Sequence, residues 1–230
     1  MIEFSDLASR ELYRDLAEAG SLKAALEMAS QERGIDLGEV TAPEGDAGLV
    51  VAWFTSSRGG IGISLAAEER LFLIKIEGKG HGWATGGTPV LLDAARTVEA
   101  WRRGASLQAL KSAFPFMGYT RLAQAFEEGN PTAVRWQELI GDGDLDDLRP
   151  LLVTAHRHLT LGKLFPSVTH LTLLRLAIDP SDRSAGEAWI ALEAGSSYSI
   201  GASWAPESRR ASSVDDAIAE AAEILTQRQD

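Results

Sequence analysis

Apolar residues recur at helical spacing near the start of the chain. Ser21 can cap a helix, because its hydroxyl can accept a hydrogen bond from a backbone N–H of the first turn, and Gly34 can end one. The apolar positions between them follow the spacing i, i+3, i+4 and i+7 (Leu22, Ala25, Leu26 and Ala29). The pattern predicts N-terminal helices within residues 1–34.

The pattern changes to that of strands after residue 48. Three apolar runs are separated by short turns, and they begin near Leu49, Ile61 and Leu71. Short turns favour an antiparallel meander. The glycine-rich residues 78–87 then predict a loop, and Thr88 predicts the cap of a helix that ends at Gly104. We therefore expect residues 49–104 to form a three-stranded meander followed by a helix.

The same order of elements returns near the C-terminus. Three further runs begin near His170, Ala188 and Ser197, and a helical pattern follows from about Ser213. Residues 105–160, between the two meanders, carry helical spacing. The sequence therefore predicts an α+β fold, with two antiparallel three-stranded meanders, each followed by a helix, and a helical insertion between them.

This order suggests a pseudo-duplicated chain. A three-stranded sheet with one apolar face cannot bury that face alone, so two such units would enclose a core together. We expect residues 49–103 to superpose on residues 170–228. The predicted segments pack as one compact unit in this interpretation (1–34, 49–104, 105–160 and 168–228).

Composition places the chain among globular proteins that work in a reducing compartment. Apolar residues make up 45% of the 230 residues, and there is no cysteine. Disulfides, thiolate metal sites and cysteine nucleophiles are thereby excluded. The first 14 residues lack the apolar core of a signal peptide, and no apolar run reaches the ~18 residues that cross a bilayer. We expect a cytoplasmic protein that is not embedded in a membrane.

The net charge of −11 narrows the choice of partners. The acidic residues are spread along the chain, so the surface should repel a phosphate backbone, and we expect no binding to nucleic acid. A basic protein partner would be attracted. The same charge also has a simpler explanation, which is that it keeps the protein soluble.

The glycine-rich loop is the strongest candidate for a binding site. It follows a strand and precedes a helix, as phosphate-binding loops do. The dinucleotide pattern G-x-G-x-x-G fails, because Trp83 occupies the place of the third glycine, and no Gly-Lys-Ser/Thr precedes the helix. A cation, a titratable ring and an aromatic residue nevertheless lie close together in it. Lys79, His81 and Trp83 are therefore the predicted binding residues.

Other patterns predict neither a metal site nor a catalytic centre. Asp142, Asp144 and Asp146 have the spacing of a calcium loop, but Asp147 and Val153 stand where glycine and glutamate are needed. Two histidines, at positions 156 and 158, are two residues apart in a predicted helix and cannot share a metal. The histidine at position 170 is expected at the start of a strand. We predict no cofactor and no catalytic residues.

Several short motifs resemble an uncharacterised family of high-GC, antibiotic-producing bacteria that is often labelled "natural product biosynthesis protein". They are Gly82-Trp83-Ala84-Thr85, Val98-Glu99-Ala100-Trp101, Gly104-Ala105-Ser106-Leu107, Phe114-Pro115-Phe116 and Leu164-Phe165-Pro166-Ser167-Val168-Thr169-His170. The resemblance covers roughly residues 80–178. It implies an accessory role in a biosynthetic setting and no particular reaction.

Together these observations favour a non-enzymatic binding or accessory protein that meets another protein in the cytosol. Neutralisation of a toxin would be one version of that role. The alternative is a small-molecule-binding protein or an enzyme of a biosynthetic pathway. A deep pocket with convergent polar groups would favour the alternative, and a broad, shallow face would favour the first hypothesis.

Overall fold

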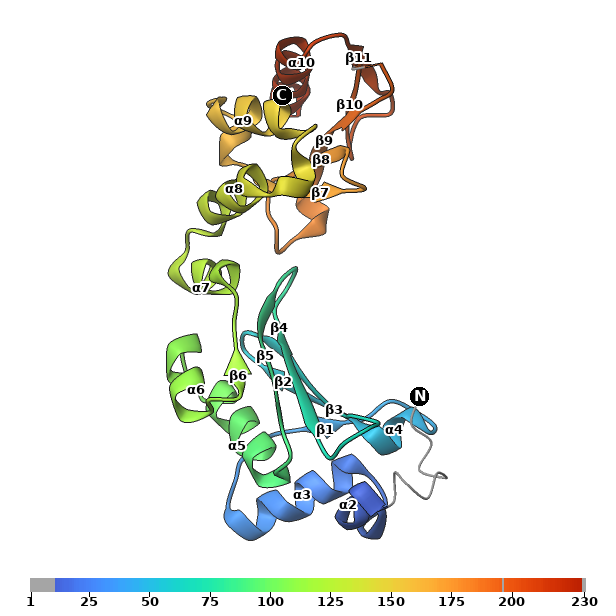
Figure 1. Cartoon of the computed structure of the whole chain (residues 1–230), viewed down its shortest axis with the longest axis vertical. Coiled ribbons are helices and arrows are strands. Elements are labelled where there is room, and N and C mark those ends of the chain that lie inside the picture. Colours follow the sequence, from blue (N-terminus) through green and yellow to red (C-terminus); the bar gives the residue numbers. More distant parts are fainter. Residues whose placement is uncertain (1–10, 196, 229–230) are drawn as a thin grey trace. The chain divides into compact units, whose positions relative to one another are not determined.

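The computed structural model describes residues 11–195 and 197–228. Within them the chain has a mixed α+β fold, as the sequence predicted, and it forms two compact units (Figure 1). The first unit ends at Glu127 and the second begins at Glu128, where the sequence led us to expect one compact unit. Each unit has its own apolar core.

The first unit combines helices with an antiparallel sheet. Its helices are α2 (Arg14–Ala19), α3 (Leu22–Arg33), α4 (Ala47–Val50), α5 (Leu91–Arg102), α6 (Leu107–Ala113) and α7 (Arg121–Glu128), the last of which crosses the boundary. Its strands are β1 (Val40–Thr41), β2 (Val51–Ser56), β3 (Gly59–Leu65), β4 (Phe72–Glu77), β5 (Gly82–Thr88) and β6 (Met117–Gly118). They form one six-stranded sheet in the order of the chain.

Alternation along the strands gives this sheet two different faces. Successive side chains point to opposite sides, so one apolar set faces the core (Ala52, Phe54, Ile61, Ile63, Leu65, Phe72, Ile74 and Ile76). Helices α3 and α5 pack against this inner face (Figure 1). The outer face carries Trp53, Gly62 and Lys75, which lie side by side on β2, β3 and β4.

The glycine-rich segment expected as a loop is largely a strand. Strand β5 occupies most of it and pairs with β4 on one side and β6 on the other. Gly86 and Gly87 allow neighbouring atoms to approach the strand closely and do not form a turn. A Cβ on Gly86 would lie 2.5 Å from the carbonyl oxygen of Phe116, and one on Gly87 would lie 3.1 Å from the Leu71 side chain. Glycine is the residue that permits such contacts inside a strand.

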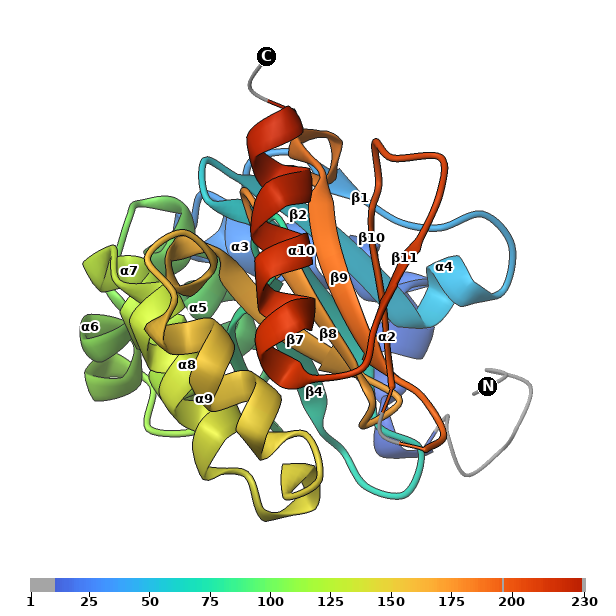
Figure 2. The same cartoon turned by 90° about the horizontal axis from the view of Figure 1, so that it is seen from above.

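The second unit repeats this kind of arrangement. Its helices are α8 (Pro131–Gly141), α9 (Arg149–Arg157) and α10 (Val214–Gln227), with 3₁₀ turns η1 (Gly143–Leu145), η2 (Leu161–Lys163) and η3 (Arg183–Ala185). Its strands are β7 (Phe165–Thr169), β8 (Leu173–Ala177), β9 (Glu187–Leu192), β10 (Tyr198–Ala202) and β11 (Arg209–Ala211). They form a five-stranded antiparallel sheet in the order of the chain. Helix α10 lies along its inner face, against β9, β10 and β11 (Figure 2).

The two units share an order of elements that is longer than the predicted one. In each, two helices precede a meander of five consecutive antiparallel strands, and a helix follows it. The first unit adds the short α4 within its meander, and α6, β6 and α7 after that helix. The predicted triplets are the three middle strands of each meander, so three strands was too few. The helical segment expected over residues 105–160 is divided, because α6 belongs to the first unit and α8 and α9 belong to the second.

Candidate functional site

The three residues predicted as a binding site lie around the turn between β4 and β5. Lys79 is exposed, His81 is half-buried, and Trp83 is buried within β5. The rings of His81 and Trp83 meet edge to face with their centroids 4.3 Å apart. The Nδ1 atom of His81 lies 3.2 Å from the carbonyl oxygen of Lys79. The structure thus brings His81 and Trp83 together, and Lys79 reaches them through its backbone.

The further partners of these rings come from distant parts of the first unit. The His81 ring stacks on Phe126 of α7, with a centroid distance of 3.7 Å and an interplanar angle of 5°. Trp83 donates from Nε1 to the carbonyl oxygen of Arg58 at 2.9 Å, and its ring lies 5.7 Å from that of Trp101. These packing contacts hold the β4–β5 turn against α5 and α7.

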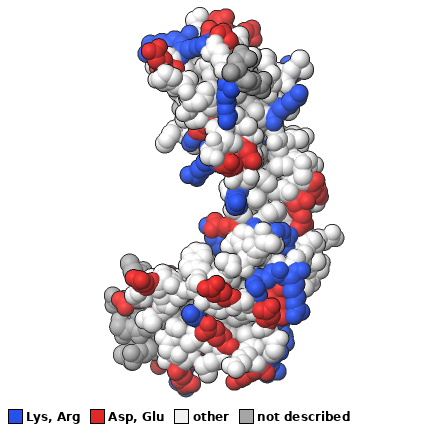
Figure 3. Space-filling model, turned by 180° about the vertical axis from the view of Figure 1, so that it is seen from behind, with Lys and Arg blue, Asp and Glu red and all other residues white. Residues whose placement is uncertain are grey.

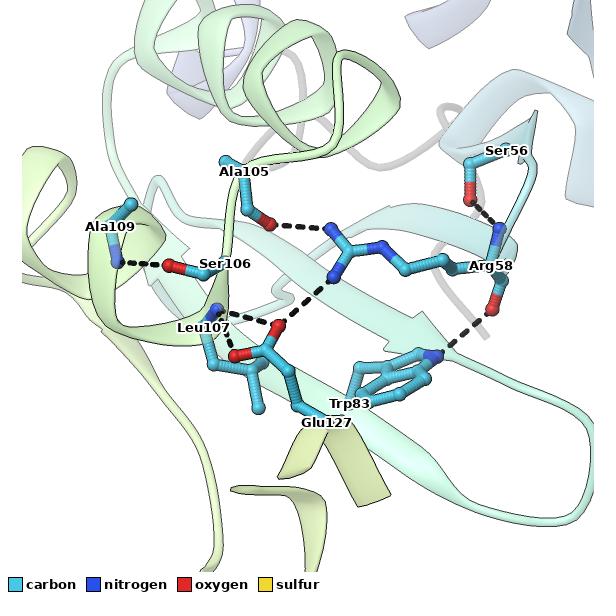
Figure 4. A network of polar contacts seen from close by, with 8 residues as sticks. All are labelled: Ser56, Arg58, Trp83, Ala105, Ser106, Leu107, Ala109 and Glu127. Carbon is cyan, nitrogen blue, oxygen red and sulfur yellow. Dashed lines mark hydrogen bonds and ion pairs between the residues drawn. The ribbon is translucent and has the colours of Figure 1, made fainter. Parts of the chain in front are cut away.

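Arg58 links this cluster to the end of α7 (Figure 4). Its guanidinium lies over the ring of Trp101, 3.4 Å from the centroid, and it donates to the carbonyl oxygen of Ala105. It also pairs with Glu127 at 3.1 Å. The Glu127 carboxylate in turn accepts from the backbone N–H of Leu107, at 3.1 Å to each oxygen. The Glu127 carboxylate therefore joins the end of α7 to Arg58 in the β2–β3 turn by an ion pair and to the start of α6 by hydrogen bonds.

Burial changes the proton affinity of two groups in this cluster. It lowers the pKa of His81, and the contact with the Lys79 carbonyl only partly opposes this effect. Burial also lowers the pKa of Arg58, against the effect of the neighbouring Glu127. Within the described residues, Nε2 of His81 is buried without a hydrogen-bond partner. The neutral imidazole is therefore the form that this packing favours.

We expect the first unit to lose stability as the pH falls below about 6.5, the ordinary pKa of a histidine. Because the pKa of His81 is lowered in the folded state, the unfolded chain binds more protons below that pH, and the free energy of unfolding decreases. His81→Phe keeps a ring against Phe126 and removes the titrating group. Urea unfolding of both proteins between pH 5 and 8 should show a smaller loss in the variant. Parallel losses would assign the pH dependence to other groups.

The outer face of the first sheet forms a groove along β3. Its floor is made of the small residues Gly62 and Ser64, with Trp53 on the β2 side and Leu73 on the β4 side. The Trp53 ring lies over β3, because a Cβ on Gly62 would be 2.7 Å from its Cζ3 atom. Trp53 is 44% exposed and Leu73 is 42% exposed. The cavity between them measures about 400 Å³.

This groove continues toward the turn between β3 and β4. A second cavity, of about 570 Å³, shares Val51, Ser64 and Leu73 with the first and extends to Glu68 and Glu69. We call the two cavities together the β3 groove. Our interpretation of the sequence did not identify it, although the small residues that alternate with apolar ones along β3 carry its signal.

The second unit also has an outer sheet face with a tryptophan laid over a glycine. A Cβ on Gly201 of β10 would be 2.4 Å from the ring of Trp189 on β9. Next to it, Arg175 pairs with Glu187. The shallow cavity at this place measures about 530 Å³ and includes Ser199. Its centre is a compensated ion pair beside an aromatic ring, so it is more polar than the β3 groove.

The acidic loop before α9 is engaged in local structure. Asp142 accepts from the backbone N–H of Asp144 at 3.0 Å and caps η1, and Asp146 pairs with Arg149. No group of three or more His, Asp or Glu side chains that could hold a metal ion occurs in residues 11–195 and 197–228. Capping and a local ion pair thus account for the spacing of these carboxylates.

Each histidine of the second unit has different neighbours. His156 stacks on Trp136, with centroids 5.2 Å apart, and Nδ1 of His158 accepts from the backbone of Thr160 at 3.3 Å. The prediction for His170 was wrong. It is exposed, has a φ of 54° and lies in the turn before β8 rather than at the start of that strand. The apolar run misled because Leu171, which follows it, also lies in the turn.

Acidic and basic side chains are interspersed on the face shown in Figure 3. Among the helices that the structure describes, none combines the length and the apolar character that a membrane span requires.

Comparison of the chain with protein-family models, with curated proteins and with solved structures gave no match in any of the three.

Proposed function

We propose that this is a non-enzymatic binding or accessory protein and that it meets a protein partner through the β3 groove. The observation that carries the proposal is the pair of exposed side chains, Trp53 and Leu73, on the outer sheet face, opposite the face against which α3 and α5 pack. Tryptophan is enriched among the residues that dominate binding energy at protein interfaces. Burying an apolar side chain contributes roughly 1.5–3 kcal/mol.

The groove has the shape expected of a recognition surface rather than a reaction centre. It is a shallow channel along a strand, and Lys75, the one cation among its described lining residues, is paired with Glu77 at 2.7 Å. No histidine lines either of its cavities. Convergent polar groups, which an enzyme would need, are not part of this surface.

A small apolar ligand is a second candidate occupant. The cavity between Trp53 and Leu73, at about 400 Å³, is within the usual range of 300–1,000 Å³ for small-molecule sites, and apolar surface dominates its lining. This candidate corresponds to a small-molecule-binding protein of a biosynthetic pathway. The accessory role in natural-product biosynthesis, the role in toxin neutralisation and the cytosolic setting stay proposals that derive from the sequence.

We also propose that the two units are copies of one repeated unit. The shared order of two helices, five antiparallel strands and a helix supports this idea. So does the tryptophan that lies over a glycine on each outer face, Trp53 over Gly62 and Trp189 over Gly201. Trp53 lies on β2, the second strand of its meander, whereas Trp189 lies on β9, the third strand of its own. The two copies would therefore have diverged at their surfaces. Superposition of residues 49–103 on residues 170–228 is the test.

The double variant Trp53→Ala/Leu73→Ala should lose the partner. Affinity capture with the full chain, from extracts of the cells that make it, would compare the wild type with this variant. Truncating residues at the centre of an interface costs roughly 2 kcal/mol or more each, so recovery should fall at least tenfold. The matched control is Met28→Ala, which removes another exposed apolar side chain (55% exposed) from α3. Equal recovery with all three proteins would remove the β3 groove from consideration.

A further inference from the structure

The β3 groove has a direction that its lining residues define. At one end Trp53 and Lys75 lie on either side of Gly62, and Glu77 neutralises Lys75. The next level along β3 is apolar on both sides, with Val51 and Leu73 flanking Ser64. At the other end the groove reaches the β3–β4 turn, where the exposed Glu68 and Glu69 line its second cavity. It therefore passes from neutral through apolar to acidic.

The turn that carries Glu68 and Glu69 is held in place from below. Tyr13 is buried beneath it, and its hydroxyl lies 2.9 Å from the carbonyl oxygens of both Ala66 and Glu69. The same hydroxyl accepts from the backbone N–H of Leu71 at 2.9 Å. This buried hydroxyl thus accepts from one backbone N–H of the turn and can donate its single proton to one of the carbonyl oxygens around it.

Arg70 fixes the same turn from its side. Its guanidinium pairs with Asp15 at 2.7 Å and donates to the carbonyl oxygen of Leu12 at 2.9 Å. Its Nε donates to the carbonyl oxygen of Pro89 at 3.0 Å. With both anchors in place, the two glutamates are presented on a preorganised turn. Preorganisation reduces the entropy that binding would otherwise cost.

The two glutamates are uncompensated. Neither forms an ion pair within the part of the chain that the structure describes, whereas Asp15, which holds the same turn through Arg70, does. Carboxylates on the rim of an apolar groove attract a cation and set the orientation of the segment that carries it. Strand β3 is seven residues long, which corresponds to roughly 23 Å of extended chain.

We propose, building on the function proposed above, that the β3 groove receives an extended protein segment with a run of apolar side chains that ends in lysine or arginine. The apolar side chains pack against Trp53 and Leu73, and the basic end lies at Glu68 and Glu69. The net charge of −11 favours the same partner, because it attracts basic segments at long range.

The probe for this proposal is a pair of synthetic peptides. One is an acetylated, amidated peptide of six alternating serine and leucine residues that ends in two lysines, and the other ends in two glutamates instead. Titration into the full chain, followed by amide chemical shifts, should show the lysine peptide shifting β2–β4 and the β3–β4 turn. The glutamate peptide should bind at least tenfold more weakly. Equal binding of the two, or no binding of the lysine peptide, overturns the proposal.

Two variants of equal net charge separate the site from general electrostatics. Glu68→Gln/Glu69→Gln should weaken binding of the lysine peptide at least tenfold. The control Glu18→Gln/Glu32→Gln removes two exposed carboxylates of α2 and α3, which have no ion pair within the described residues, and should leave binding unchanged. Equal weakening in both variants would reduce the effect to the overall charge and overturn the assignment to this turn. Thermal unfolding of each variant confirms that the fold is kept.

The failure of this proposal can be told apart from the failure of the proposed function. If capture of the partner is lost in Trp53→Ala/Leu73→Ala but kept in Glu68→Gln/Glu69→Gln, the surface is right and the basic segment is wrong. If sedimentation shows a dimer that Trp53→Ala/Leu73→Ala dissociates, a second copy of this chain occupies the groove, which also overturns the proposal. If a small apolar molecule binds saturably and displaces no partner, the groove belongs to that ligand. This outcome also overturns the proposal of a basic segment.

Discussion

Replacing Gly59 with alanine is expected to lower the free energy of unfolding of the first unit by about 3–5 kcal/mol. Gly59 has a φ of 128°, a backbone conformation that costs other residues roughly 1–3 kcal/mol. A Cβ there would also lie 2.0 Å from the carbonyl oxygen of Glu77, which belongs to the adjacent strand and cannot rotate away. Overpacking of this kind adds about 1–3 kcal/mol. The turn would have to open, and the backbone of Arg58 that holds Trp83 would move with it.

The neighbouring residue provides the control. Gly60 lies in the same strand without a positive φ, and the nearest atom to a Cβ there is the carbonyl oxygen of Phe54 at 4.0 Å. Gly60→Ala should therefore change stability by less than about 0.5 kcal/mol. Hydrogen exchange of the β3 and β4 amides, measured in the full chain, reports the first unit separately from the second. Similar exchange in the two variants would show that the turn relaxes at little cost.

Several helix boundaries with a local chemical cause could be predicted from the sequence, but the prediction for Thr88 was wrong. Thr88 is the last residue of β5, and α5 begins at Leu91, after Val90. Ser21 accepts from the backbone N–H of Ala24 at 3.1 Å, and Gly34 adopts the left-handed conformation that ends α3. Ser106 and Ser213 likewise cap α6 and α10. In each case the residues that decide the boundary are within four positions of it, so one short window of sequence contains the whole cause.

Strands that depend on distant partners were the elements missed. Strand β5 has five glycines around it, and only pairing with β4 and β6 makes it a strand. Strands β1 and β6 are two residues long and carry no periodicity. Strand β7 contains Pro166, which reads as a break but is tolerated at a sheet edge. These pairings join residues that are distant in the chain, so the local pattern of the sequence does not indicate them.

The candidate site followed the same division. His81 and Trp83 are close in the chain, so the sequence alone could group them in one candidate site. Their partners Arg58, Trp101 and Phe126 could not, because each reaches the cluster through the fold of the whole unit. The β3 groove was missed for a different reason. The small residues Gly62 and Ser64 form the floor of a channel only because β2 and β4 place large neighbours on both sides of them.

Arg58→Leu is expected to release the end of α7 and to destabilise the first unit by about 3 kcal/mol. The change leaves the Glu127 carboxylate without its cation, removes a donor from the carbonyl oxygen of Ala105 and uncovers the ring of Trp101. Both members of the ion pair are only about a quarter exposed, 25% and 26%, so water replaces the lost contacts poorly.

A surface pair in the same unit supplies the comparison for this variant. Arg96 pairs with Asp93 at 3.8 Å on α5 and is 52% exposed, so Arg96→Leu should cost less than about 0.5 kcal/mol. The distinguishing readout is local. In Arg58→Leu the amides of residues 121–127, and the N–H of Leu107 that Glu127 accepts, should exchange faster than in either the wild type or Arg96→Leu. If α7 keeps its protection while the unit loses stability, Arg58 acts through Trp101 alone, and the ion pair with Glu127 does not hold the helix.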